Sequence, residues 1–85
     1  MYKNKNGTRN NITGIAIHNL RCSQNPKMSQ RALADRMQLE GLDLDKNAIQ
    51  RLESGQRFIT DIELIAFARV FGVPVSSLYE IDSEE

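Results

Sequence analysis

The chain has very few of the residues that build disulfide or metal frameworks. Its 85 residues include one cysteine, Cys22, one histidine, His18, and no tryptophan. A single cysteine forms no internal disulfide, and one Cys with one His supplies too few ligands for a structural zinc site. We therefore expect no metal site and no other cofactor.

Long hydrophobic runs are also missing. No apolar stretch is long enough to span a bilayer, and residues 1–11 are polar, so no secretory signal is recognisable there. A chain of 85 residues forms one small domain with little room for a catalytic cleft. These features favour a cytoplasmic protein that is not an enzyme.

Net charge is absent as well, since 11 Lys and Arg residues balance 11 Asp and Glu residues. Duplex affinity comes largely from neutralised phosphates, so a zero total at first argues against a nucleic-acid partner. The distribution is uneven, however: residues 1–36 carry seven basic residues and one acidic residue, whereas residues 37–85 carry four basic and ten acidic ones. A chain polarised in this way can present one basic face to a polyanion.

Apolar periodicity predicts helices only, because no segment alternates with a period of two residues. Residues 1–10 have almost no apolar content and are predicted to form a flexible basic arm, whereas residues 81–85 form an acidic tail. The predicted domain, 11–80, contains five helices around one core. Their approximate ranges are Asn11–Gln24, Ser29–Gly41, Asp45–Gly55, Thr60–Gly72 and Val75–Glu80.

Helix starts and stops can be predicted from single residues. Hydroxyl and carboxylate side chains that accept a backbone N–H favour helix starts, and glycine favours helix ends. The predicted N-caps are Ser29, Asp45 and Thr60, the last in a capping box with Glu63, and the predicted stops are Gly41, Gly55 and Gly72. The second, third and fourth predicted helices are therefore bounded by their own local sequence.

The third predicted helix separates sharply into an apolar and a polar side. Wound at about 100° per residue, it gathers Ala48, Ile49 and Leu52 on one side. The other side carries Asn47, Gln50, Arg51 and Ser54, with Lys46 at its edge. Amide and cationic side chains of this kind hydrogen-bond adenine and guanine in the major groove. Any solvated helix face carries such residues, so this pattern alone leaves DNA binding open.

Four groups of residues add a more specific pattern. They are Gly14-x-x-Ile17-x-x-Leu20-Arg21, Ser29-Gln30-x-x-Leu33-Ala34, Ile49-x-x-Leu52-Glu53-x-Gly55 and Leu64-x-x-x-Ala68-x-x-Phe71-Gly72-Val73, followed by Leu78. Their order and spacing over about residues 11–79 resemble the Cro and cI phage-repressor family of helix-turn-helix proteins, also called the xenobiotic-response-element (XRE) type. The resemblance implies an all-α, five-helix, lambda-repressor-like DNA-binding domain.

The resemblance also implies a function. Relatives of this type are bacterial or phage transcription regulators, usually repressors, that bind double-stranded DNA with the third helix in the major groove and the second across the backbone. The implied base contacts are Lys46, Asn47, Gln50 and Arg51. The implied phosphate contacts are Ser29, Gln30, Arg31, Ser54, Gln56 and Arg57. Arg21 and Glu53 are implied to form a structural salt bridge between the first and third helices, and not a catalytic pair.

The chain departs from the family between Ala34 and Ile49, where it has about five more residues than a tight helix-turn-helix connection needs. We expect the second helix to gain about one turn and the segment 41–44 to bulge outward. Three leucines should pack beneath the bulge: Leu39, Leu42 and Leu44. Its acidic residues should point away from DNA, whose phosphates would repel them: Glu40, Asp43 and Asp45.

Two other interpretations stay open. The acidic second half and the longer turn are also consistent with a helix-turn-helix module that binds a protein, as an antitoxin-like partner does. Its affinity should depend weakly on salt, whereas DNA affinity should fall steeply. An enzyme is least favoured, because His18 and Cys22, one helical turn apart, are a potential base and nucleophile without an orienting group.

Reading an operator usually takes two copies of the protein, so we expect a weak homodimer that tightens on DNA. The apolar candidates for the dimer interface are Phe58, Val73, Val75, Leu78 and Ile81. Of these, Leu78 is expected to belong to the core instead. No small-molecule ligand is inferred.

Overall fold

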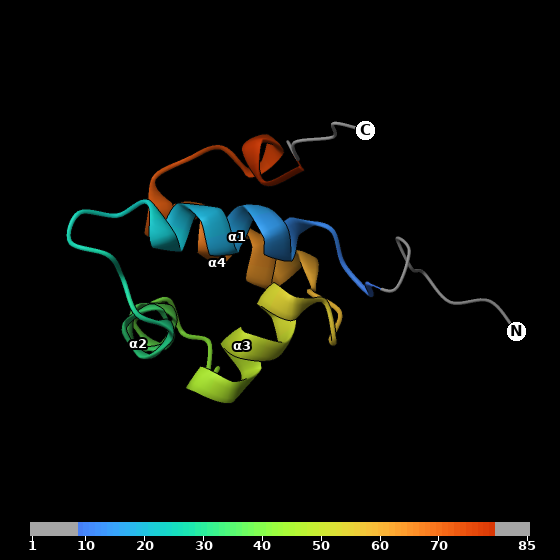
Figure 1. Cartoon of the computed structure of the whole chain (residues 1–85), viewed down its shortest axis with the longest axis horizontal. Helices are drawn as coiled ribbons and strands as arrows, with labels where there is room; N and C mark the ends of the chain where they lie inside the picture. The colour runs from blue at the N-terminus through green and yellow to red at the C-terminus, as the bar shows by residue number, and fades with distance from the viewer. Residues whose placement is uncertain (1–8, 80–85) are drawn as a thin grey trace, which may run out of the picture.

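Four α-helices and one 3₁₀-helix follow one another in the computed structural model, which describes residues 9–79 (Figure 1). Their bounds are α1 Thr13–Cys22, α2 Gln30–Leu39, α3 Lys46–Ser54, α4 Asp61–Phe71 and η1 Val75–Tyr79. Between residues 9 and 79 there is no strand, and no helix there is long and apolar enough to cross a membrane. The domain is all-helical, as predicted.

The fifth predicted helix differs in type from the prediction. It is the 3₁₀-helix η1 rather than an α-helix. The backbone N–H of Ser77 donates to the carbonyl oxygen of Pro74 at 3.0 Å, and its hydroxyl donates to the same oxygen at 2.8 Å. This three-residue spacing tightens the turn into 3₁₀ geometry, which is typical of such short segments.

The predicted N-caps of α2, α3 and α4 are confirmed. Ser29 Oγ accepts the N–H of Ala32 at 3.0 Å, and Asp45 Oδ1 accepts the N–H of Ala48 at 2.8 Å. Thr60 and Glu63 bond each other's backbone N–H in a reciprocal capping box. Such caps typically contribute about 1 kcal/mol each, because they satisfy N–H groups that have no partner within the helix.

The predicted glycine stops are confirmed too. Gly55 has φ of +85°, the left-handed conformation that a side chain disfavours, and the N–H of Gln56 returns to the carbonyl oxygen of Arg51 at 2.8 Å. The same backbone pattern follows α2 at Gly41 and α4 at Gly72. The lengths of α2, α3 and α4 are therefore set locally at both ends.

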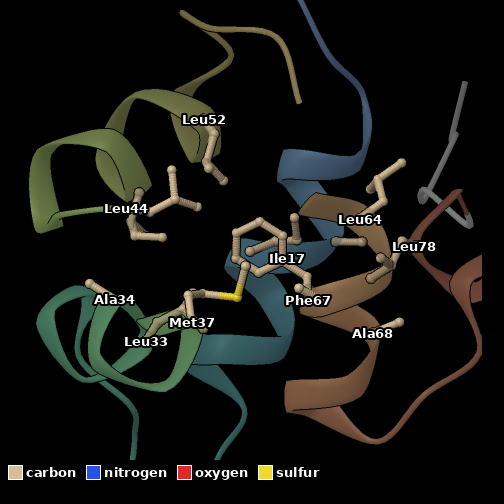
Figure 2. Close-up of a cluster of buried hydrophobic side chains, with 13 residues drawn as sticks. Ile17, Leu33, Ala34, Met37, Leu44, Leu52, Leu64, Phe67, Ala68 and Leu78 are labelled. Atoms are coloured by element: carbon tan, nitrogen blue, oxygen red, sulfur yellow. The ribbon is translucent and has the colours of Figure 1, made fainter. Parts of the chain in front are cut away.

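One hydrophobic core holds the helices together (Figure 2). Its fully buried side chains come from every helix: Ile17, Leu33, Met37, Ile49, Leu52, Phe67 and Leu78. Burying each of them stabilises the fold by about 1.5–3 kcal/mol. Leu78 belongs to this core, as expected, and Ile49 and Leu52 fix the inner side of α3.

The connection from α2 to α3 corrects one prediction. Leu44 is buried and Leu42 packs against the core, but Leu39 is 82% exposed instead of lying beneath the bulge. Leu39 follows Met37, the last buried residue of α2, by two positions, so it points to the opposite side of the helix. The extra length of this connection relative to the family stays a prediction.

Candidate nucleic-acid interface

The outer side of α3 consists of polar side chains that the fold leaves exposed. They are the four predicted base contacts: Lys46, Asn47, Gln50 and Arg51. Within residues 9–79, none of these side chains makes a hydrogen bond or an ion pair. In Figure 1, α2 and α3 lie on one side of α1 and η1 lies on the other. The exposed side of α3 therefore has donors and acceptors available for a binding partner.

A buried ion pair lies at the last turn of α3, on the side that faces the core. It is the pair that the family resemblance implied. Arg21 of α1 approaches Glu53 in a fork, with Nε donating to Oε2 at 2.7 Å and Nη2 donating to Oε1 at 2.9 Å. Both side chains are almost completely buried. Arg21 also donates to the carbonyl oxygen of Met28 at 2.9 Å, so it links α1 to the segment that leads into α2.

Two further side chains complete a network around Glu53. Gln30 of α2 donates its amide N–H to Oε1 at 3.1 Å, and His18 Nδ1 lies 3.1 Å from the same oxygen. The carboxylate therefore joins α1, α2 and α3 at one point. Sequence reasoning named Gln30 and His18 in other roles and did not predict their contacts with Glu53, although His18 and Arg21 are one turn apart on α1 and so share a face.

The contact between His18 and Glu53 corrects the view that the His18–Cys22 pair lacks an orienting group. Cys22 Sγ lies 3.6 Å from His18 Nε2, and Glu53 holds the other ring nitrogen. Glu53 is nevertheless engaged by Arg21 and Gln30 as well. These contacts hold helices against one another.

The network shifts the ionisation of its charged members. Burial by itself raises the pKa of Glu53, but the hydrogen bonds from its three neighbours and the charge of Arg21 outweigh burial and hold that pKa below its ordinary value of 4.5. The hydrogen bond to Glu53 raises the pKa of the Arg21 guanidinium above its ordinary value, against the effect of burial. The folded domain therefore favours the charged pair.

A basic hollow of about 630 Å³ lies at the start of α2. Its lining consists mainly of cationic and hydrogen-bonding side chains: Arg21, Lys27, Ser29, Gln30, Arg31 and Lys46. Lys27, Arg31 and Lys46 are exposed. They surround a helix N-terminus, where free backbone N–H groups and the helix dipole attract anions. The hollow is therefore suited to a phosphate group.

A second hollow, of about 410 Å³, lies between α2 and α3, and its lining includes Arg31, Lys46 and Asn47. Asp45 also lines this hollow. The acidic residues of the connection between α2 and α3 were predicted instead to point away from DNA. The reason is local, since the Asp45 side chain caps α3 and so stays beside its first turn.

The comparison with known families identifies this arrangement of helices. The family model "Helix-turn-helix" (HTH_3), of the Cro/C1 and XRE-like type, matches residues 17–78, which is more than half of the chain. The chain belongs to this helix-turn-helix family. Its function class is that of a DNA-binding regulator of the Cro/C1 type. No curated protein and no solved structure matches the chain.

Within the helix-turn-helix domain, four of the predicted phosphate contacts are exposed, and two of these are Arg31 and Gln56. Neither of these side chains has a polar partner among residues 9–79. Arg31 lines the basic hollow at the start of α2, and Gln56 follows α3 directly. Both are therefore available to a phosphate.

The other predicted phosphate contacts already have partners within the domain. Gln30 bonds Glu53, and the guanidinium of Arg57 lies 3.3 Å from the carboxylate of Glu63. The hydroxyl of Ser54 donates to its own helix, and that of Ser29 accepts the cap hydrogen bond while its O–H can still donate. These residues combine structural contacts with the predicted contacts to phosphate.

Proposed function

We propose that the domain is a sequence-specific transcriptional repressor that places α3 in the major groove of an operator. One observation carries this proposal: the outer side of α3 has two amides and two cations without partners among residues 9–79, on a helix whose inner side is fully packed. Bidentate contacts to adenine and guanine need such groups on a rigid helix. Such a repressor acts where a bacterial or phage operator is found, in the cytoplasm.

The start of α2 supports a second set of contacts in this proposal. Lys27, Arg31 and Lys46 converge on the basic hollow at its first turn. When α3 lies in a major groove, α2 crosses the adjacent backbone, and a phosphate then occupies this hollow. Such contacts set register and orientation and contribute little to sequence preference.

Selection of bound duplexes from a random DNA pool tests this function directly. We expect enrichment of a short palindrome whose half-sites are about one helical turn apart. Affinity for the winning duplex should fall steeply as salt is raised, because bound phosphates release counterions. Lack of enrichment at low salt would contradict the proposal.

A protein-binding module is the second candidate, and the exposed apolar side chains favour it. On α4, Ile62 is 66% exposed and Ile65 is 46% exposed, and Leu39 of α2 is exposed too. A protein partner held by such side chains would bind with weak salt dependence. The salt titration therefore separates the two functions.

A weak homodimer is part of the proposal, because a palindromic operator needs two recognition helices. Phe58, just after α3, is 54% exposed, while Val73 and Val75 are half-buried against the core. Leu78 is buried in the core, and Ile81 lies outside the described residues. We expect Phe58 to be central to self-association, so Phe58→Ser should weaken dimerisation on the selected duplex in sedimentation experiments.

A further inference from the structure

Three consecutive residues before α1 lie across the carbonyl end of the recognition helix α3. Arg9, Asn10 and Asn11, here called the strap, donate hydrogen bonds to five backbone carbonyl oxygens within the segment 52–57. The acceptors, with their donors, are Leu52 (Asn11 Nδ2, 3.0 Å), Glu53 (Arg9 Nη2, 2.9 Å), Gly55 (Asn10 N, 2.8 Å), Gln56 (Asn10 Nδ2, 3.1 Å) and Arg57 (Asn11 Nδ2, 2.7 Å). The strap therefore joins the last turn of α3 to the turn that follows it.

These hydrogen bonds stabilise the fold because their acceptors lie at or just after the C-terminal end of α3. The last carbonyl groups of a helix have no partner within it, and the negative end of the helix dipole lies there. The Arg9 guanidinium brings a positive charge to this end, and its Nε also donates to the carbonyl oxygen of Asn11 at 3.0 Å. Burial lowers the pKa of Arg9, because its guanidinium is partly removed from water.

Two glycines make room for the strap. A Cβ added to Gly55 would come within 2.8 Å of Arg9 Cγ. One added to Gly14 would first meet the backbone carbonyl oxygen of Leu52 and would also come within 2.6 Å of Asn11 Oδ1 and 2.9 Å of Arg9 Nη2. Gly14 therefore lets α3 approach α1 as well as making room for the strap. The Oδ1 of Asn11 in turn accepts the N–H of Gly14 at 2.8 Å. The strap is therefore fitted between α1 and the end of α3.

We propose that the strap is a positioning element for DNA recognition, with Arg9 as its main positioning residue. It fixes the last turn of α3 and the turn 54–57, and thereby aims the base contact Arg51 without itself touching DNA. A helix of nine residues is marginal alone, so its ends must be held by the rest of the fold. This proposal rests on the DNA-binding function proposed above.

Substitution of Arg9 tests the proposal against a charge-matched control. Arg9→Met removes the side-chain bonds of Arg9, and Arg36→Met removes an exposed cation of α2 for which neither a DNA role nor a partner is proposed. With Arg9→Met, we expect affinity for the wild-type-selected duplex to fall about tenfold, the loss of roughly one charged hydrogen bond. Affinity for a random duplex and the slope of affinity against salt should stay unchanged. Arg36→Met should leave both affinities unchanged.

A conservative substitution separates geometry from charge. Arg9→Lys keeps the positive charge but loses the planar fork that reaches two backbone carbonyl oxygens at once. We expect Arg9→Met to lower the melting temperature, because a cation at the end of α3 is lost. Arg9→Lys should restore that temperature, but should restore the affinity for the selected duplex only in part. Full restoration of that affinity would show that charge alone matters and would overturn the positioning role.

Two other outcomes would also overturn the strap proposal. Equal losses on selected and random duplexes, with a smaller salt slope, would mean that Arg9 contacts a phosphate directly. Unchanged affinities would mean that α3 keeps its position without the strap. If the wild-type protein binds no duplex at all, the proposed DNA-binding function itself fails, and the strap proposal fails with it.

A measurement on the wild-type protein covers the case in which Arg9→Met does not fold. The backbone N–H of Asn10 donates to Gly55 at 2.8 Å, so its hydrogen exchange should be slow in the free protein. Adding the selected duplex should slow it further, by about tenfold, because binding and strap closure stabilise each other. An Asn10 amide that exchanges freely, or that DNA does not affect, would contradict the proposal.

Discussion

The polar side chains on the two sides of α3 differ in whether they have partners within the fold. On the inner side, the carboxylate of Glu53 is buried and is bonded by Arg21, His18 and Gln30. On the outer side, Gln50 and Arg51 are exposed and have no side-chain partner among residues 9–79. The difference shows that a charged side chain of α3 can be fully occupied by contacts within the fold, whereas other polar side chains of the same helix remain available to a partner.

The largest expected effect comes from breaking the inner side. Glu53→Gln removes the negative charge that faces the buried Arg21 guanidinium, so the free energy of unfolding should fall by about 3–5 kcal/mol. Glu40→Gln is the control, because Glu40 pairs with Arg69 near the surface at 3.6 Å and should contribute about 1 kcal/mol or less. Thermal and urea melts measure both. Melts of Glu53→Gln that match the wild type would refute the structural role of this carboxylate.

The next effect comes from the outer side and concerns DNA instead of folding. Arg51→Ala should weaken binding to the selected duplex by about 1–3 kcal/mol and relax the sequence preference at one base pair. Its melting curve should match the wild type, because an exposed side chain changes stability by less than about 0.5 kcal/mol. Arg69→Ala, an exposed arginine on α4, serves as the control and should leave binding unchanged. A uniform loss on every sequence would make Arg51 a phosphate contact.

Acid should remove part of the inner network without any substitution. Because the pKa of Glu53 is held below 4.5 in the folded state, its contribution is fully present above that value and is lost as pH falls through the lower, folded pKa. The difference in unfolding free energy between the wild type and Glu53→Gln should therefore shrink in acid. Urea melts at pH values from about 7 to about 3 follow this loss. A difference that stays constant across that range would contradict the assignment.

The smallest effect is expected at Gln30, which combines a structural contact within the fold with a predicted contact to DNA. Its amide donates to Glu53, and it is also a predicted phosphate contact at the start of α2. Gln30→Ala should lower the free energy of unfolding by about 1 kcal/mol, the contribution of one hydrogen bond. It should also weaken binding to selected and random duplexes alike. A loss confined to the selected duplex would make Gln30 a base contact instead.

Much of the local structure could be predicted from the sequence. Ser29, Asp45 and Thr60 were predicted as N-caps and serve as such, because a cap bond reaches only three residues along the chain. The separation of α3 into two sides could be predicted as well, since helical periodicity places Ile49 and Leu52 together.

The strap and the full Glu53 network could not be predicted in this way. Arg9, Asn10 and Asn11 contact acceptors more than 40 residues away in the chain, and no local pattern indicates such a pairing. The segment 1–10 was predicted to be an arm, yet Arg9 and Asn10 bond to the end of α3, while residues 1–8 lie outside the described part. Leu39 was misjudged because its hydrophobicity, rather than its position on α2, was taken as decisive.

By itself, the sequence determined where α2, α3 and α4 begin and end, which residues of α3 face outward and which family the domain resembles. These features depend on neighbours within about one or two helical turns, so they are encoded locally. Only the tertiary structure decided which polar groups are occupied within the fold and which remain available. That depends on groups such as Arg21 and Glu53, which are brought within 2.7 Å across 32 residues of chain by the packing of a common core.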